Sequence, residues 1–173
     1  YDCASYPLLY EVKKYWSTIF VSTGATFDDE IQGAAKILEG SNYHFLHCTT
    51  IYPTPLKDLN LRRMDYLRRH TQKIGYSDHT KVVETQVIAS KIALALGASC
   101  IERHFTILER DQTRDGPVSI NPLELKQLTD FAKFPRSKMI SLINEEFSNW
   151  EITLGASSRE LTNEELLNRD YYR

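Results

Sequence analysis

Two histidines are the residues of this sequence whose type and spacing point most directly to chemistry. His79 and His104 lie 25 residues apart, and each follows a short apolar run. Two neutral imidazoles suit a first-row divalent metal, with carboxylates or water in the remaining positions. Two histidines that cap strands with satisfied hydrogen bonds would give the same spacing, so the spacing alone leaves both interpretations open. Asp78 could orient a neighbouring ligand or accept a backbone hydrogen bond.

Hydroxyl groups occur at corresponding places after the other apolar runs. Ser22, Thr23, Thr50 and Ser77 each occupy such a place, and Gly24 would let a ligand approach the backbone closely before a helix N-terminus. Together these groups could hold a phosphate. Each of them alone is also explained by capping and turn chemistry. Four consecutive runs that end in hydroxyls or histidines favour one shared polar pocket.

The remaining histidines and one proline-rich loop have weaker signals. His44 and His70 are expected to be solvated in loops, and His47 and Cys48 are expected in the core. The segment Tyr52-Pro53-Thr54-Pro55 is expected to be stiff, because each proline fixes its own φ and restricts the residue before it. Such a loop either presents its tyrosine to a ligand or simply connects two elements.

Four strands and their following helices must position these groups. The apolar runs predict strands near residues 19–21, 45–46, 73–76 and 100–101, with ends 26, 29 and 26 residues apart. That repeat is the length of one strand plus one crossover helix, the unit of a parallel sheet. Helices are predicted from a capping box at Thr26 and Asp29 to Gly40, and over residues 59–69, 81–96, 123–131 and 137–147.

Four βα units leave a parallel sheet with two open edges, which natural folds close or cover. We therefore expect an α/β chain that is part of a TIM (β/α)₈ barrel, with about four βα units followed by helices and a polar tail from Gly155 to Arg173 that resembles a linker. A four-stranded doubly wound domain is the alternative, but no GxGxxG follows any strand. The other half of the barrel is expected on the N-terminal side.

Composition excludes several classes of protein. The 173 residues are 42% hydrophobic and 25% charged, with a net charge of -2 and no clustered basic tract, so nucleic-acid or membrane-surface binding has no support. No apolar run of membrane-spanning length and no signal sequence is visible. Cys3, Cys48 and Cys100 are widely spaced without a CxxC, which favours a reducing cytoplasm. The chain does not begin with methionine, so we expect it to be part of a longer protein.

Five linked segments resemble the sialic acid synthase family. VSTGAT, LHCTTIYPTP, GYSDHT, GASCIERHFT and DGPVSINPLEL occur in the family's order and spacing, and the similarity covers about residues 1–131. The family makes N-acetylneuraminate and relatives such as legionaminic and pseudaminic acids. The resemblance implies that this chain holds strands five to eight, with residues 1–150 as the C-terminal half of the catalytic (β/α)₈ barrel. Residues 151–173 would be a linker toward a missing antifreeze-like domain.

The resemblance also implies a role for individual residues. His79 and His104 match the family's two metal-binding histidines, which makes them the implied catalytic residues, with Mn²⁺ favoured and Mg²⁺ or Co²⁺ as alternatives. Three hydroxyl positions match contacts to phosphoenolpyruvate, namely Ser22, Thr50 (Asn in some members) and Ser77.

Three further positions match contacts to the sugar. Asp2 stands where many members have a glutamate that contacts the amino sugar, and Tyr52 matches a sugar-contacting tyrosine. Many members have GPD in the loop after the last strand, whereas this chain has Asp115-Gly116-Pro117. Counting from His104 without gaps places Asp115 where the family's aspartate binds substrate hydroxyls, but the changed order puts the identity of the sugar in doubt.

The implied reaction is an aldol-type condensation of phosphoenolpyruvate with an N-acetylmannosamine-like aldehyde that releases phosphate. The family keeps an acidic catalytic residue and phosphate-binding lysines on its first strands, and its C-terminal domain closes the partner's site in a homodimer. This chain contains neither part, so we expect it to be inactive alone. A metal-dependent hydrolase or a non-catalytic sugar-phosphate binder on the same barrel are the alternatives. Sugar-dependent phosphate release separates all three.

Overall fold

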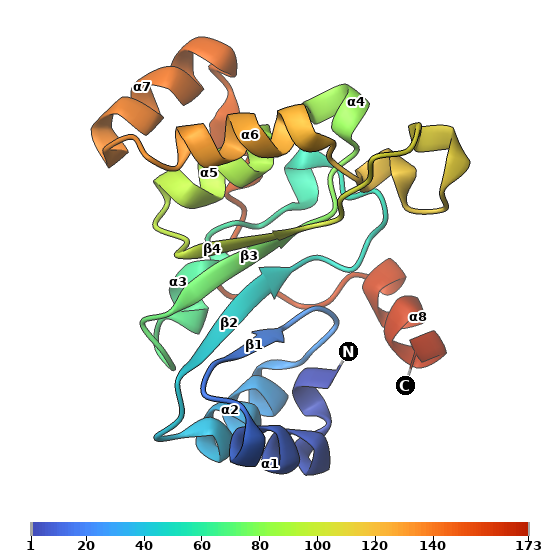
Figure 1. The fold of residues 1–173 in the computed structure, drawn as a ribbon. Coiled ribbons are helices and arrows are strands. Elements are labelled where there is room, and N and C mark those ends of the chain that lie inside the picture. Colours follow the sequence, from blue (N-terminus) through green and yellow to red (C-terminus); the bar gives the residue numbers. More distant parts are fainter. Residues whose placement is uncertain (1, 173) are drawn as a thin grey trace.

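The computed structural model describes residues 2–172, and a four-stranded parallel sheet lies at its centre (Figure 1). The order in the sheet is β1-β2-β3-β4, so strands that follow one another in the sequence are neighbours. The strands are β1 (Ile19–Ser22), β2 (Tyr43–Cys48), β3 (Ile74–Asp78) and β4 (Cys100–Arg103). All four predicted strands are confirmed, as is the parallel pairing.

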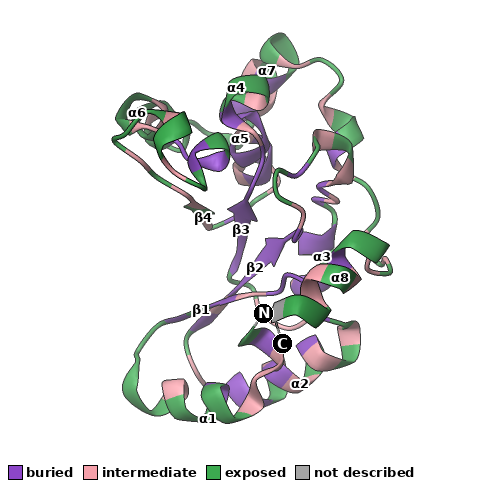
Figure 2. Ribbon diagram, turned by 90° about the vertical axis from the view of Figure 1, so that its right-hand side faces the viewer, coloured by how far each residue is buried: buried purple, intermediate pink, exposed green. Residues whose placement is uncertain are grey.

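The two faces of the sheet differ in burial. Val21, Phe45 and Ile74 lie side by side on three strands and belong to the main hydrophobic core, which the helices cover (Figure 2). On the opposite face, Phe20 is 56% exposed. The edge strand β1 is therefore exposed on the side that would be the interior of a barrel, whereas β3 is buried on both of its sides.

The helices lie along the sheet from its β1 edge to its β4 edge (Figure 1). Helices α1 and α2 lie beside β1 and β2, whereas α5, α6 and α7 lie beside β3 and β4. The helices are α1 (Tyr6–Tyr15), α2 (Asp28–Leu38), α3 (Arg63–Leu67), α4 (Val82–Thr85), α5 (Ile88–Ala95), α6 (Pro122–Phe131), α7 (Arg136–Glu146) and α8 (Asn163–Tyr172). Short 3₁₀ turns are η1 (Asp2–Ala4), η2 (Leu56–Asp58), η3 (Arg110–Gln112), η4 (Gly116–Val118) and η5 (Trp150–Thr153).

Three helix predictions need correction. The single helix expected over residues 81–96 is broken into α4 and α5 at Gln86, whose φ of 50° cannot continue a right-handed helix. The helix expected over residues 59–69 is only α3, five residues long. Thr26 does not cap α2: its hydroxyl donates to the carbonyl of Gly24, and Glu30 instead accepts from the backbone N–H of Phe27.

The polar tail is more ordered than expected. Residues 163–172 form α8, which lies near the carboxyl ends of β1 and β2 (Figure 1). The helix begins with a capping arrangement in which Thr162 and Glu165 exchange hydrogen bonds. The role of residues 151–173 as a link to a further domain stays a prediction.

The four parallel strands form a half-barrel with an open edge at β1 and another at β4. Large apolar side chains remain exposed near both edges: Trp16 is 61% and Phe105 50% exposed. Within residues 2–172, no helix combines the length and apolar character needed to cross a membrane. Cys3, Cys48 and Cys100 are free thiols.

Candidate active site

A buried ion pair fixes the carboxyl ends of β3 and β4. Asp78 is completely buried and pairs with Arg103 of the neighbouring strand. Its carboxylate also accepts hydrogen bonds from the N–H of Thr80 at 2.9 Å, the Thr80 hydroxyl at 2.8 Å and the Ser90 hydroxyl at 2.5 Å. These bonds fix Asp78 and Thr80, the two neighbours of His79 in the sequence, and Arg103, the residue before His104.

The two predicted histidines converge at this end of the sheet. The rings of His79 and His104 are 5.2 Å apart between centroids and nearly perpendicular, at 70°. Nδ1 of His79 lies 3.7 Å from the Cys48 sulfur, and the Tyr52 ring lies 4.2 Å from the His79 ring. Nδ1 of His104 lies 3.6 Å from a carboxylate oxygen of Asp115. Tyr52 and Asp115 therefore lie beside the histidine pair; that they contact a sugar stays a prediction.

Burial keeps His79 neutral. The side chain is 5% exposed, and the loss of hydration lowers its pKa from 6.5 to about 4, with the nearby His104 acting in the same direction. Near pH 7 the ring therefore carries one free nitrogen lone pair, as a metal ligand requires.

The donor set fits a metal in part. Two close imidazoles, one of them held neutral, are ligands that manganese, cobalt or zinc accepts. Among residues 2–172 there is no group of three or more His, Cys, Asp or Glu side chains placed to hold an ion. The pair would therefore need water, substrate oxygens or groups from outside the described residues to complete a coordination sphere.

Two serines meet at a buried thiol beside the histidines. Ser77 of β3 is the sheet neighbour of Cys48 on β2, and Ser22 of β1 lies on the other side of Cys48; both hydroxyls are near enough to its thiol to counter in part the effect of burial on its pKa. Burial raises the pKa of this thiol to about 11, so the group is neutral and acts only as a weak hydrogen-bonding partner. The predicted substrate-binding serines thus belong to the same cluster as His79.

Thr50 offers a buried hydroxyl without a partner. The residue is 2% exposed, and its Oγ1 has no hydrogen-bond partner in the described structure. A buried hydroxyl normally finds one, so the group is poised for a ligand or water. Its methyl group lies against Gly24, where an added Cβ would be only 2.5 Å away. Gly24 is therefore required for the contact between the first two strand-end loops.

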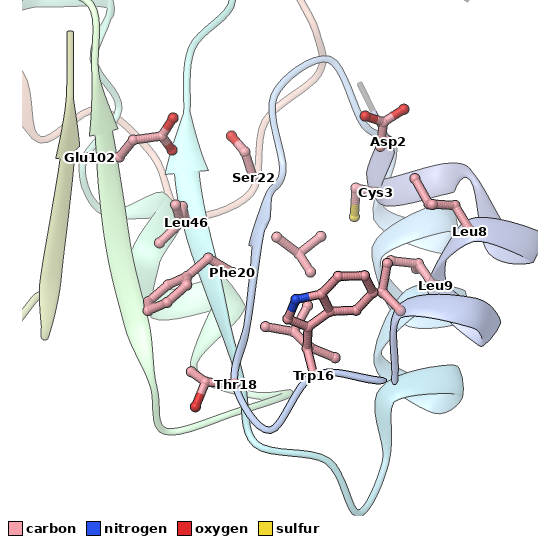
Figure 3. Close-up of a pocket in the computed structure, with 13 residues that line it drawn as sticks. Asp2, Cys3, Leu8, Leu9, Trp16, Thr18, Phe20, Ser22, Leu46 and Glu102 are labelled. Atoms are coloured by element: carbon pink, nitrogen blue, oxygen red, sulfur yellow. The ribbon is translucent and has the colours of Figure 1, made fainter. Parts of the chain in front are cut away.

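Two acidic side chains lie on opposite sides of one pocket beside β1 (Figure 3). Asp2 and Glu102 line one pocket together with Ser22, and all three side chains lie toward the carboxyl ends of the strands. Asp2 therefore reaches the same region as a predicted substrate-binding serine. Glu102 was missed from the sequence, although its alignment with Ser77 across the β3–β4 pair would have indicated the same face.

The other predicted polar residues have structural roles. Thr23 donates its hydroxyl to the carbonyl of Leu46 at 3.0 Å rather than facing a ligand. His44 lies within β2 and not in a loop, with its ring 4.7 Å from that of Phe20. His70 is partly buried against aromatic rings, and His47 is buried as predicted, bonded to a backbone carbonyl at 2.7 Å.

The fold and these side chains define the class of the molecule: a β/α half-barrel with a polar, histidine-containing site at the carboxyl ends of its strands. The model of the NeuB family matches residues 1–139. The chain belongs to the NeuB family.

Named relatives agree with this assignment. The chain is 36% identical over 133 residues to N,N'-diacetyllegionaminic acid synthase of Campylobacter jejuni, which covers 73% of this chain and 39% of the relative. It is 34% identical over 133 residues to N-acetylneuraminate-9-phosphate synthase of Drosophila melanogaster, covering 74% and 35% of the two chains. The chain therefore spans less than half the length of these curated relatives.

Solved structures show the same fold. The spore coat polysaccharide biosynthesis protein SpsE of Bacillus subtilis superimposes with a TM-score of 0.79 at 28% identity, over 99% of this chain and 48% of that one. The N-acetylneuraminic acid synthetase of Leptospira borgpetersenii, solved in complex with citrate, gives a TM-score of 0.70 at 27% identity, over 98% and 54%.

Proposed function

We propose that this chain is the C-terminal half, strands five to eight, of a barrel that condenses phosphoenolpyruvate with an N-acetylmannosamine-like aldehyde. The product is a sialic acid or a related nonulosonic acid, and phosphate is released. The observation that carries the proposal is the convergence of His79 and His104 beside the hydroxyls of Ser22, Thr50 and Ser77. Family membership and the synthase names of the relatives support it.

His79 and His104 would hold the divalent metal, Mn²⁺ in first place and Mg²⁺ or Co²⁺ as alternatives. When bound, such an ion supplies a Lewis acid that polarises the aldehyde oxygen. Cys48 and Asp115 face Nδ1 of the two rings, which leaves Nε2 of each as the nitrogen for the ion. In this arrangement Nδ1–H of His79 donates to the Cys48 sulfur, which fixes the tautomer of the ring.

Phosphoenolpyruvate would lie on the hydroxyl side of the cluster. Thr50 has a buried hydroxyl ready to donate, and the hydroxyls of Ser22 and Ser77 come from the two flanking strands. Hydrogen bonds from hydroxyls to ionised phosphate and carboxylate oxygens are stronger than those between neutral groups. They hold the methylene carbon of phosphoenolpyruvate in place to attack the aldehyde carbon. Water then adds at the former enol carbon, and the tetrahedral intermediate loses phosphate.

The sugar would be held by the residues around the histidines. The Tyr52 ring lies tilted against that of His79, Asp115 lies beside His104, and Asp2 borders the pocket with Ser22. Gly116 stabilises the loop of Asp115, because its Cα packs directly on the backbone of Arg110 and leaves no room for a side chain.

The complete enzyme would extend beyond this chain. We propose that the first barrel strands supply an acidic catalytic residue and phosphate-binding lysines. Residues 151–173 would lead to a small antifreeze-like domain that closes the partner's site in a homodimer. The free thiols suit a cytoplasmic enzyme.

Phosphate release from phosphoenolpyruvate by the full-length protein tests the proposal. The assay compares Mn²⁺ with chelator across a panel of N-acetylmannosamine-type sugars. Release that needs both sugar and metal is the expected result, and the best sugar names the product. Phosphate release from a sugar phosphate without phosphoenolpyruvate would indicate a hydrolase. Absence of release from a folded, metal-loaded protein that binds both ligands would indicate a non-catalytic binder.

A further inference from the structure

Helix α8 is anchored by a buried carboxylate. Glu165 is completely buried and forms a two-pronged ion pair with Arg159, with N–O distances of 2.6 and 2.7 Å. The same carboxylate accepts the N–H of Thr162 at 3.0 Å. A bidentate arginine–carboxylate pair has a defined geometry, so the start of α8 is fixed in orientation.

The second half of α8 holds the two loops that carry the hydroxyl side of the site. The Asn168 side-chain amide donates to the carbonyl of Thr50 at 2.5 Å, after β2. The Arg169 guanidinium donates to the carbonyl of Ala25 at 2.7 Å, after β1, and pairs with Glu30 at 2.6 and 2.8 Å. Two adjacent side chains of one helix therefore bond to both strand-end loops.

Both loops need such support. Ala25 has a φ of 49°, in the left-handed region that a non-glycine residue adopts only at a cost. Gly24 and Thr50 touch so closely that a single methyl group would not fit between them. A small shift of either loop would therefore move the Thr50 hydroxyl.

Few apolar contacts hold α8 itself. Among its described side chains only Glu165 is buried, and Leu167 is 70% exposed. Elements attached mainly by polar bonds detach locally at a free energy well below that of global unfolding. We therefore expect α8 to affect the positions of the two loops that it contacts more than the stability of the whole fold.

We propose that α8 is a strap whose Asn168 and Arg169 are positioning residues for the phosphoenolpyruvate side of the site. The strap holds the backbone at Thr50 and Ala25, and through it the direction of the Thr50 hydroxyl. The importance of that hydroxyl for substrate rests on the proposed function. The strap does not contact the histidine pair, whose strand ends are held by the Asp78–Arg103 ion pair.

The test uses Asn168→Leu and Arg169→Met in the full-length protein, with Leu167→Ala on the exposed side of α8 as the matched control. Two quantities are measured: amide hydrogen exchange at residues 24–27 and 50–52, and phosphoenolpyruvate binding by calorimetry. Asn168→Leu removes one hydrogen bond, and Arg169→Met removes one hydrogen bond to a loop carbonyl together with the ion pair to Glu30. Exchange at the loops is therefore expected to be faster, and binding weaker, by at least about threefold to tenfold. Mn²⁺ binding, the unfolding temperature and the control remain unchanged.

If hydrogen exchange at the two loops were unchanged in both variants, the proposal that α8 is a strap would be wrong. Uniformly faster exchange over the whole chain, with a lowered unfolding temperature, would also overturn it, because α8 would then be ordinary scaffold. Faster loop exchange in a protein whose unmodified form binds no phosphoenolpyruvate would support the strap and contradict the proposed function.

Discussion

At the scale of single residues, the site depends on side chains that burial keeps uncharged. His79 and Cys48 share one hydrogen bond, and burial shifts the pKa of both toward their neutral forms. Sequence spacing located His79 and His104, because parallel strands bring their carboxyl ends together. It did not reveal the contact of Cys48 with His79 and two serines, since that contact depends on which face of the sheet each side chain points to.

Removing either histidine should abolish metal binding. His79→Ala and His104→Ala in the full-length protein are each expected to weaken Mn²⁺ binding by more than about a hundredfold, beyond the usual effect of changes outside the ligand shell. Calorimetric titration with Mn²⁺ measures this. His44→Gln, at the other end of β2, is the control and should bind normally. Normal affinity in either alanine variant would remove that histidine from the ligand set.

Stability should depend on pH through His47. Burial lowers its pKa from 6.5 to about 4, so between these values the unfolded chain binds a proton that the native chain does not. The contribution of His47 to the free energy of unfolding should therefore fall by about 3 kcal/mol as the pH drops from 6.5 to 4, and His79, with the same pKa shift, should add a similar fall. Urea unfolding at several pH values measures the slope. His47→Gln keeps a donor for the carbonyl of Leu59 and should reduce the slope to the part that His79 contributes; an unchanged slope would contradict the assignment to His47.

At the scale of elements, successive side chains of β3 point to opposite faces of the sheet, and this separates the residue that lines the site from the residue that stabilises the fold. Ser77 contacts the thiol of the site, whereas Asp78 pairs with Arg103 and bonds Ser90 of α5. The four strands could be predicted, because apolar runs at a constant repeat specify parallel strands. The break between α4 and α5 could not, since residues 81–96 are good helix formers and only the tertiary structure imposes the positive φ at Gln86.

Breaking the buried ion pair should destabilise the fold strongly. Asp78→Asn leaves the Arg103 guanidinium buried without its counter-charge, which costs about 3–5 kcal/mol in comparable buried pairs. Denaturant unfolding gives the change in free energy. Asp130→Asn removes a carboxylate from an exposed pair of lysine contacts and should change little. Equal stability of the two variants would show that the pair does not hold the strand ends.

At the scale of the whole molecule, the sheet is open at both edges. Apolar side chains lie exposed beside β1 and after β4, among them Trp16 and Phe105. The sequence predicted a half-barrel from the number of βα units alone. It could not predict α8, because the tail is polar and its order comes from bonds to distant loops, such as that of Asn168 with Thr50.

The 173-residue chain is expected to release no phosphate by itself. It holds the histidine pair and three hydroxyls but not the groups proposed for the first strands. The measurement is phosphate release with Mn²⁺, phosphoenolpyruvate and N-acetylmannosamine, at equal concentrations of this chain and of the full-length protein. Turnover only by the latter supports the division of the site. Measurable turnover by the isolated chain would overturn it.

The separation of roles along β3 has a consequence for how such a protein can evolve. Asp78, which secures the strand ends, points toward Ser90 of α5, whereas Tyr52 and Asp115, which contact the sugar in our proposal, belong to loops. If the proposed function holds, mutations in the loops would alter sugar preference while the scaffold persists. Related proteins could then acquire different sugar specificities through single substitutions in the loops. The residue order around Asp115, which differs from that of many family members, would be one such change.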